Sequence, residues 1–321
     1  MILVTGGSGF IGGNLVERLI AGGERVRCLV RRRAVAAHAR VESVPGDLLT
    51  GSGVAEALEG VDRVIHLAGV TKVLRASEYE RGNVLATETL AQAIARAGRP
   101  IRLVHVSSLA AVGPAAEDAP VTEDAPPRPV GHYGRSKLAG ERKVREIVPG
   151  AVIVRPPVVY GPRDTDVFEL LRSISMGVVL EIAGGERYFS AIYVEDLADG
   201  LIAAARAPGA TGRTYFLAHR QVVSWTEFAR LAQRVMGIRA RVLRVPRPIA
   251  HGVGWGAEIW AQFSRKPGII SRDKVAEAVE RWWTCDPARA AAELGFTAKT
   301  PIEEGLPRTL AWYREAGWLK Y

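Results

Sequence analysis

A tyrosine and a lysine four residues apart form a pair that could move a proton. Tyr133 and Lys137 open a stretch with helical spacing, so both side chains project from one face of the same helix. A free phenol titrates near ~10, too high for a base at neutral pH, and a neighbouring ammonium favours the phenolate. Ser108 ends an earlier apolar run and could hydrogen-bond to an oxygen that changes between alcohol and carbonyl. These side chains predict acid–base chemistry at a carbon–oxygen bond, although Tyr-x-x-x-Lys alone is common on solvated helix faces.

A glycine-rich segment near the start of the chain gives this pair a context. It follows a short apolar run, typical of a strand buried on both faces, and precedes helical periodicity at residues 14–20. Gly7, Gly9 and Gly12 match G-x-G-x-x-G, and Gly6 begins a variant with a wider first spacing. Such glycines allow a tight turn, close approach to a pyrophosphate and close helix packing, while the helix N-terminus faces the phosphates. The segment predicts a dinucleotide site, with an unliganded strand–turn–helix as the alternative.

The residues after the second expected strand, 25–30, bear on the choice of cofactor. An NAD site usually has an acid there for the ribose 2′-hydroxyl, whereas an NADP site has an arginine nearby for the 2′-phosphate. This chain continues with Arg31, Arg32 and Arg33 and has no acid there. Guanidinium groups bind phosphate through charge-assisted, often bidentate contacts. We expect NADP(H) in preference to NAD(H); a solvated arginine turn is the alternative.

The elements that must position these residues alternate between strand and helix. Further strands are expected at 41–44, 63–67 and 101–106, and helices at 52–58 and 78–97. This alternation predicts an α/β fold with a doubly wound parallel sheet, whose ligands bind at the carboxyl ends of the strands. Gly69 and Ser108 both fall at such ends.

Composition narrows the classes of protein. The 321 residues, 48% of them hydrophobic, suffice for one large α/β domain with an appendage or for two domains. The net charge of +9 is spread along the chain without a nucleic-acid motif, so we expect no nucleic-acid partner. Cys28 and Cys285 form no disulfide framework, and His66, His105 and His251 have no metal-ligand spacing. With no membrane-spanning run and no room for a signal peptide, a cytoplasmic location is expected.

Taken together, these residues resemble the extended short-chain dehydrogenase/reductase superfamily over essentially the whole chain. The similarity is strongest to dihydroflavonol reductase and 3β-hydroxysteroid dehydrogenase-like members of the NAD(P)-dependent epimerase/dehydratase family. The segments that carry it are residues 5–12, 47–48, 67–69, 83–84, 106–108, Tyr133 with Lys137, 155–162, 193–198 and 286–296.

The resemblance implies hydride transfer at the nicotinamide C4. It gives Tyr133 the role of acid and base, Lys137 that of lowering its pKa and holding the ribose, and Ser108 that of orienting the substrate oxygen. With the arginines after the second strand, the expected cofactor-binding residues are Gly6, Gly9, Phe10, Ile11, Gly12, Arg31, Arg32, Asp47, Leu48, Ala68, Gly69, Asn83, Tyr133, Lys137 and Pro157. No metal is expected.

Departures from the family pattern favour its reductase branch. Nucleotide-sugar epimerases commonly carry an arginine seven residues before the acid matched by Asp196; here that position is Phe189, with Arg187 two residues away. Sugar dehydratases have Thr and an acid where this chain has residues 109–111, LAA, and epimerases usually have an acid where it has Arg31. The expected function is NADP(H)-dependent interconversion of a secondary alcohol and a ketone on a medium-sized, apolar, alicyclic substrate. A nucleotide-sugar epimerase with tightly held NAD is the alternative, followed by a non-catalytic NADP-sensing regulator.

The rest of the chain is expected to bind the substrate. We expect a Rossmann domain over residues 1–163, to which the chain returns at 188–206, and a substrate-binding region over 164–321. A helix is expected at 225–235 with Ser224 as its N-cap. Residues 255–263 place aromatic and apolar side chains on one helical face; a core helix is favoured over a lid or a membrane-resting helix, so membrane contact is not expected. By resemblance, a homodimer through the helices starting near Glu78 and Tyr133 is expected.

Overall fold

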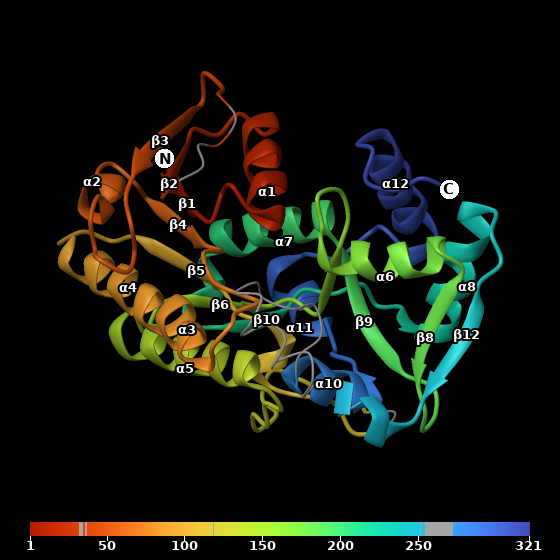
Figure 1. Cartoon of the computed structure of the whole chain (residues 1–321). Helices are drawn as coiled ribbons and strands as arrows, with labels where there is room; N and C mark the ends of the chain where they lie inside the picture. The colour runs from red at the N-terminus through yellow and green to blue at the C-terminus, as the bar shows by residue number, and fades with distance from the viewer. Residues whose placement is uncertain (32–34, 36, 118, 251, 254–271) are drawn as a thin grey trace.

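Seven parallel strands form the main sheet of the computed structural model, which describes the whole chain except residues 32–34, 36, 118, 251 and 254–271 (Figure 1). Their order is β10-β6-β5-β4-β1-β2-β3, and every neighbouring pair is parallel. The strands are β1 (Ile2–Thr5), β2 (Val26–Val30), β3 (Val41–Pro45), β4 (Arg63–His66), β5 (Arg102–Val106), β6 (Val152–Arg155) and β10 (Thr214–Phe216). The central strands are buried along their length, as continuous apolar runs require. The predicted doubly wound α/β fold is confirmed.

Helices cover both faces of this sheet (Figure 1). On one face lie α1 (Phe10–Ala21), α7 (Val194–Arg206) and α11 (Ala288–Leu294). On the other lie α2 (Val54–Leu58), α4 (Ala86–Arg96) and α5 (His132–Ile147). The helix expected at 78–97 runs through α3 (Ala76–Tyr79), a π-helical turn η1 (Glu80–Leu85) and α4. π-helical turns often occur at functional sites.

Smaller sheets and helices form a second part of the molecule. One sheet holds β11 (Val222–Ser224), β9 (Tyr188–Tyr193) and β13 (Trp282–Trp283), with β7 (Val158–Tyr160) also paired to β9; a second holds β8 (Val178–Ile182) and β12 (Arg241–Val245). The helices of this part are α6 (Asp166–Ser175), α8 (Trp225–Met236), α10 (Arg272–Val279) and α12 (Ile302–Glu315). Two 3-10 turns follow elements of the first part: η2 (Leu109–Ala111) comes after β5 and η3 (Pro208–Ala210) after α7. The apolar faces of α6, α8 and α12 share one core with β7, β8, β9 and β11, to which Tyr160, Leu171, Phe228, Leu306 and Tyr313 belong.

The expected helix after Ser224 is confirmed, with its cap. The Ser224 hydroxyl accepts from the Glu227 N–H at 3.1 Å, and the Glu227 carboxylate accepts from the Ser224 N–H at 3.0 Å. This reciprocal capping box satisfies two N–H groups that a helix start leaves without partners.

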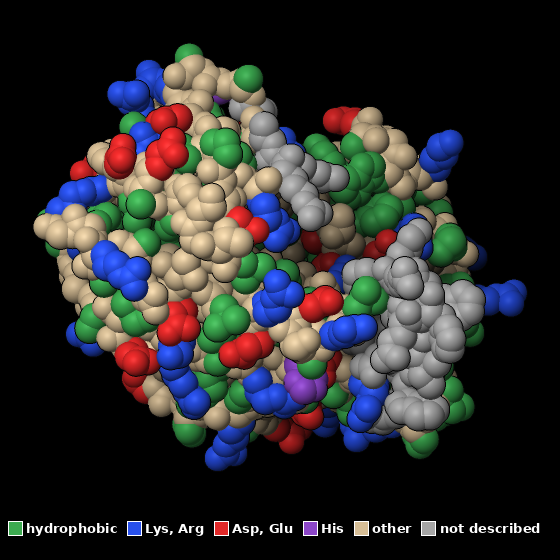
Figure 2. Space-filling view, turned by 60° about the vertical axis from the view of Figure 1, so that its left-hand side comes forward, with side chains coloured by type: hydrophobic (Ala, Val, Ile, Leu, Met, Phe, Trp, Pro, Cys, Tyr) green, Lys and Arg blue, Asp and Glu red, His purple; other side chains and the backbone are tan. Residues whose placement is uncertain are grey.

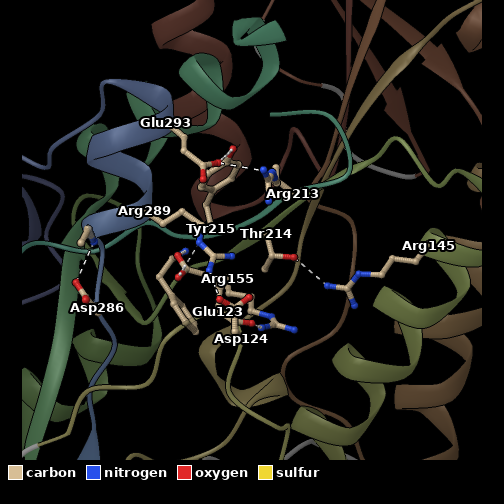
Figure 3. Close-up of polar contacts among 12 residues, drawn as sticks. Glu123, Asp124, Arg145, Arg155, Arg213, Thr214, Tyr215, Asp286, Arg289 and Glu293 are labelled. Carbon is tan, nitrogen blue, oxygen red and sulfur yellow. Dashed lines mark hydrogen bonds and ion pairs between the residues drawn. The ribbon is translucent and has the colours of Figure 1, made fainter. Parts of the chain in front are cut away.

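A network of ion pairs joins the proline-rich loop before α5 to the sheet and to α11 (Figure 3). Arg155 of β6, 3% exposed, makes two hydrogen bonds to the buried Glu141 of α5, at 2.8 and 2.7 Å. Arg289 of α11 pairs with Glu123 and Asp124 of the loop. The Glu123 carboxylate also accepts from the Phe216 N–H of β10 at 3.0 Å, so the loop that leads to Tyr133 is held at both the sheet and α11.

Several expectations concern residues away from the predicted site. Cys28 and Cys285 are free and buried. His66 lies in the core between Thr5 and Thr87, 2.6 and 3.0 Å from their hydroxyls, and burial with the Lys137 charge lowers its pKa to about 3.

Among the described residues, no set of side chains could hold a metal ion, and no helix is long and apolar enough to cross a membrane. Basic and acidic side chains are interspersed on the face in Figure 2. His251 and the aromatic stretch 255–263 lie outside the described residues.

Candidate active site

The turn after β1 has the geometry of a phosphate cradle. Gly6 has φ +77°, and a Cβ on Gly12 would lie 2.1 Å from the Gly6 carbonyl oxygen, so a side chain fits at neither position without rearrangement. The Gly9 N–H donates to the Gly6 carbonyl at 3.0 Å, and α1 begins at Phe10 with no side-chain cap. The N–H groups of the first turn of α1, which includes Ile11, are thus available to an anion. The residues present fit a dinucleotide.

The neighbouring turn after β4 is braced against this cradle. A Cβ on Gly6 would lie 2.8 Å from the Ala68 nitrogen, and the Ala68 N–H donates to the Thr5 hydroxyl at 3.3 Å. Asn83 of η1 bonds both the N–H and the carbonyl of Val70, at 2.8 and 3.0 Å, and donates to the Ser136 hydroxyl of α5 at 2.9 Å. A Cβ on Gly69 would lie 2.8 Å from the Asn83 amide oxygen. Asn83 is 2% exposed, so its role here is to hold the turn and α5 together.

Residues expected near the adenosine follow β2 and β3. Arg31 is exposed directly after β2, while Arg32 lies outside the described residues. Asp47 follows β3, and its carboxylate accepts from the Leu49 N–H at 2.9 Å. Leu48 is 7% exposed and packs in the core, so its side chain offers little surface to a ligand.

The three residues predicted for acid–base chemistry come together at the carboxyl end of β5. Tyr133 lies in the first turn of α5, which packs on the turn after Ser108: a Cβ on Gly134 would lie 2.3 Å from the Ala110 carbonyl oxygen, and Ser108 acts to lower the pKa of the Tyr133 phenol. The Ser108 hydroxyl also accepts from the Ala110 N–H at 3.1 Å, which caps η2. Pro157 lies just after β6, beside the Pro156 carbonyl that accepts from the Leu109 N–H at 2.9 Å.

Lys137 faces the strand rather than the phenol. Its ammonium donates to the Val106 carbonyl at 2.7 Å, and burial lowers its pKa to about 8 while Glu141 acts in the opposite direction. A Cβ on Gly69 would lie 3.9 Å from the Lys137 Nζ, which places the ammonium under the turn after β4.

The electrostatics of Tyr133 differ from the expectation. Burial raises the pKa of the phenol, and this effect outweighs the groups that lower it, of which Lys274 is the largest and Ser108 the next. The sequence predicts a lowered pKa because it reveals the neighbouring lysine on the helix but not how far the phenol is removed from water.

Helix α10 brings residues to the site that sequence reasoning missed. The Lys274 Nζ lies 5.9 Å from the centroid of the Tyr133 ring, and the Tyr79 ring of α3 lies 5.9 Å from the same ring. The Asp273 carboxylate accepts from the His132 N–H at the start of α5, at 2.6 Å. Residues 272–279 carry no motif and follow Tyr133 by more than a hundred positions, so no local signal could have placed them here.

Phe189 and Arg187, the positions on which the epimerase alternative depends, both make contacts within the protein. Phe189 packs edge-on against Phe228, with ring centroids 6.0 Å apart. The Arg187 guanidinium donates to the backbone carbonyls of Ala278 at 2.7 Å, Gly185 at 3.0 Å and Ile182 at 2.5 Å. A cavity of about 600 Å³ between β8, β12 and α8 is partly lined by Arg187, but by none of the predicted site residues.

A doubly wound sheet, a glycine-rich turn after its first strand, and a serine, a tyrosine and a lysine at the same edge define an NAD(P)-binding Rossmann protein. The model of the NAD dependent epimerase/dehydratase family matches residues 2–218, and the chain belongs to that family, within the extended short-chain dehydrogenase/reductase superfamily. It is accordingly an NAD(P)-dependent enzyme of the oxidoreductase/epimerase type.

Three relatives illustrate the range of this family. The chain is 34% identical to ceramide reductase of Caulobacter vibrioides, over 99% of this chain and 96% of that protein. It is 31% identical to 4-hydroxy-2-methyl-3-oxo-4-farnesyl-3,4-dihydroquinoline-1-oxide ketoreductase of Stigmatella aurantiaca, over 94% and 93% of the two chains. Among solved structures, MoeE5 in complex with UDP-glucuronic acid and NAD superimposes with a TM-score of 0.79 at 27% identity, covering 98% of this chain and 99% of that one.

Proposed function

We propose that this enzyme is an NADP(H)-dependent oxidoreductase that interconverts a ketone and a secondary alcohol on a lipophilic substrate. The observation that carries the proposal is the placement of Tyr133 in the first turn of α5 against the turn that begins at Ser108, at the carboxyl end of β5, where Lys137 also donates to the Val106 carbonyl. Two relatives that cover nearly the whole chain are named as reductases of a ceramide-related and a farnesyl-bearing compound, which supports a lipophilic substrate.

Each residue has a distinct role in this proposal. A bound nicotinamide cofactor would supply the hydride to the carbonyl carbon in reduction and accept it from the alcohol carbon in oxidation. Tyr133 gives its phenolic proton to the carbonyl oxygen during reduction and takes it back during oxidation, and Ser108 hydrogen-bonds to the same oxygen. Lys137, under the turn after β4, holds the cofactor ribose. Phe10 and Ile11, in the first turn of α1, present backbone N–H groups to the pyrophosphate together with the glycines, and Asp47 lies at the adenine end.

The arrangement of Arg187 and Phe189 supports reduction over epimerisation. A sugar-nucleotide pyrophosphate needs a cationic group in the cleft, whereas Phe189 is apolar and the Arg187 guanidinium already donates to four backbone carbonyls. Arg31 after β2 supports NADP(H) as the cofactor.

The proposal is tested by turnover of NADPH with a panel of steroid and long-chain aliphatic ketones. Tyr133→Phe should lower kcat/KM by at least about 100-fold, because it removes the proton donor and leaves the ring in place. Tyr188→Phe is the matched control, since its ring stacks on Trp282 outside the site, and it should leave kcat/KM unchanged. Turnover that survives in Tyr133→Phe would exclude the assigned acid, and a chain that binds NADPH but turns over no ketone would favour a sensor.

We also propose a homodimer formed by the helices that include η1, α4 and α5. α4 and α5 lie on the same outer face of the sheet, and Leu85 at the end of η1 is 46% exposed. Light scattering should return about two chain masses, and one chain mass would contradict this assembly.

A further inference from the structure

Hydrogen bonds hold helix α10 at both of its ends, to the start of α5 at one end and to Trp283 and Arg187 at the other. At its start, the Asp273 carboxylate accepts from the His132 N–H at 2.6 Å, one residue before Tyr133. Near its end, the Glu277 carbonyl accepts from the Trp283 indole at 2.8 Å and the Ala278 carbonyl accepts from Arg187 at 2.7 Å. Val275, 7% exposed, faces inward between these contacts. The helix therefore presents its first turn to Tyr133 in a defined position.

The ammonium group of Lys274, in that first turn, lies near the face of the Tyr133 ring. Its Nζ lies 5.9 Å from the ring centroid, within the range of a cation–π interaction. The Glu277 carboxylate, three residues further along α10, pairs with the same ammonium at 3.3 Å and limits its freedom. The Lys274 side chain is 38% exposed, so part of its charge is screened by solvent.

Charged groups from several elements face the Tyr133 phenol. Glu277 of α10 and Asp166 of α6 disfavour the phenolate, and each is paired with a lysine, Lys274 and Lys72 respectively. Ser108 favours the phenolate. Lys274 is the largest contribution in that direction, whereas Lys137 donates to the Val106 carbonyl.

We propose that Lys274 is a positioning residue for Tyr133: its ammonium, held over the ring by α10, stabilises the ionised phenol, while Lys137 serves the strand and the cofactor ribose. The two lysines thus divide between them the tasks that the family pattern assigns to Lys137 alone. This inference rests on the proposed function, in which Tyr133 exchanges a proton with the substrate oxygen.

The consequence is a shift in the pH dependence of turnover. Without the Lys274 charge the phenol holds its proton to higher pH, because one stabilising cation is lost. Reduction needs the protonated phenol, so the fall in its rate at alkaline pH should move upward. Oxidation needs the phenolate, so the rise in its rate should move upward as well. We expect a displacement of about one pH unit, since the charge lies about 6 Å away and is partly solvated.

The experiment compares Lys274→Met, which removes the charge at similar length, with Lys274→Arg, which keeps it. The matched control is Lys299→Met, which makes the same charge change at an exposed position away from the site. Profiles of kcat/KM against pH are measured in both directions. In addition, tyrosinate absorbance is titrated, with Tyr133→Phe in each background identifying the Tyr133 signal. We expect both readouts to shift upward in Lys274→Met, and both to stay near wild type in Lys274→Arg and Lys299→Met.

Unchanged profiles and an unchanged Tyr133 titration in Lys274→Met would overturn the inference. A rise in KM with an unaltered pH profile would also overturn it and would make Lys274 a substrate-binding group. If Tyr133→Phe retained full turnover, the proposed function would fail, but the absorbance titration would still report whether Lys274 acts on Tyr133. The two failures are therefore distinguishable.

Discussion

At the scale of single residues, Tyr133 shows how burial and neighbouring charges compete. Burial alone raises the pKa of its phenol, and Lys274 and Ser108 act in the opposite direction. The pKa of Lys137, lowered to about 8, shows the same burial acting on a cation. Groups that are removed from water in this way need partners inside the protein if they are to exchange protons near neutral pH.

Arg31 allows a direct test of cofactor choice at this scale. Arg31→Asp should weaken NADPH binding by about 10- to 100-fold, because a charge-assisted contact to the 2′-phosphate is replaced by repulsion. NADH binding should change little. Fluorescence titration with NADPH and with NADH measures both affinities. The control is Arg25→Asp, which makes the same charge change at an exposed arginine immediately before β2. Equal loss for NADPH and NADH, or NAD carried through purification, would count against an NADP(H) enzyme.

At the scale of elements, the start of α1 depends on close packing between the helix and the turn after β1. A Cβ on Gly12 would meet the Gly6 carbonyl oxygen at 2.1 Å, and this oxygen belongs to backbone that cannot rotate away. A Cβ on the next residue, Gly13, would first meet the Arg163 guanidinium, at 3.1 Å, and this is the flexible end of a side chain. Adjacent glycines of one helix thus meet different constraints.

Alanine substitutions at these two positions separate the constraints. Gly12→Ala should cost about 1–3 kcal/mol in the free energy of unfolding and abolish dinucleotide binding, because the turn must move. Gly13→Ala should be neutral or stabilise by up to about 1 kcal/mol, because alanine favours the helix. Urea unfolding and NADPH titration of both variants provide the measurements. Equal behaviour of the two variants would show that the packing of the turn is not the constraint.

At the scale of the whole molecule, Asp164 joins several parts of the structure after β7. Its carboxylate accepts from the N–H groups of Asp166 and Val167, each at 2.9 Å, and its carbonyl accepts from the Tyr313 hydroxyl of α12 at 2.8 Å. The residue is 3% exposed, and burial raises the pKa of its carboxyl group to about 7. A buried acid of this kind couples the stability of the fold to pH.

The sign of this coupling follows from where the proton is held. The folded protein keeps the Asp164 proton up to about pH 7, whereas the unfolded chain releases it near its ordinary pKa of 3.8. The Asp164 contribution to the free energy of unfolding therefore falls as the pH rises from about 4 to 7, by about 1.4 kcal/mol for each unit of pKa difference. Relative to wild type, Asp164→Asn should gain stability across that window and change no further above it.

Chemical denaturation at a series of pH values checks this difference. Asp62→Asn is an informative control, because the N-terminal ammonium lowers the pKa of the Asp62 carboxyl and the coupling has the opposite sign. A constant difference between wild type and Asp164→Asn from pH 4 to 8 would contradict the assignment.

Several structural elements could be predicted from the sequence because the residues that specify them are close together in the chain. The apolar run, the glycines and the helical spacing that follow one another at the start of the chain predict β1, the turn and α1. The Ser224 N-cap is predicted for the same reason, since its hydroxyl accepts from an N–H only three residues further along the chain. Helix α12 was missed although Ile302, Leu306, Leu310 and Tyr313 repeat at helical spacing and are buried. That signal was in the sequence.

Other features depend on tertiary structure alone. Asp273 and Lys274 reach the start of α5 only because the pairing of β13 with β9 and the position of α10 bring the chain back beside this helix. The degree to which Tyr133 is removed from water depends on all the elements around it, so the direction of its pKa shift could not be read from the neighbouring Lys137. The sequence by itself determined the sheet, the glycine turn and the residue types at the strand ends, because these follow from periodicity and spacing within one segment. The tertiary structure decided which charges face those residues, because burial and electrostatic interactions depend on distance in space.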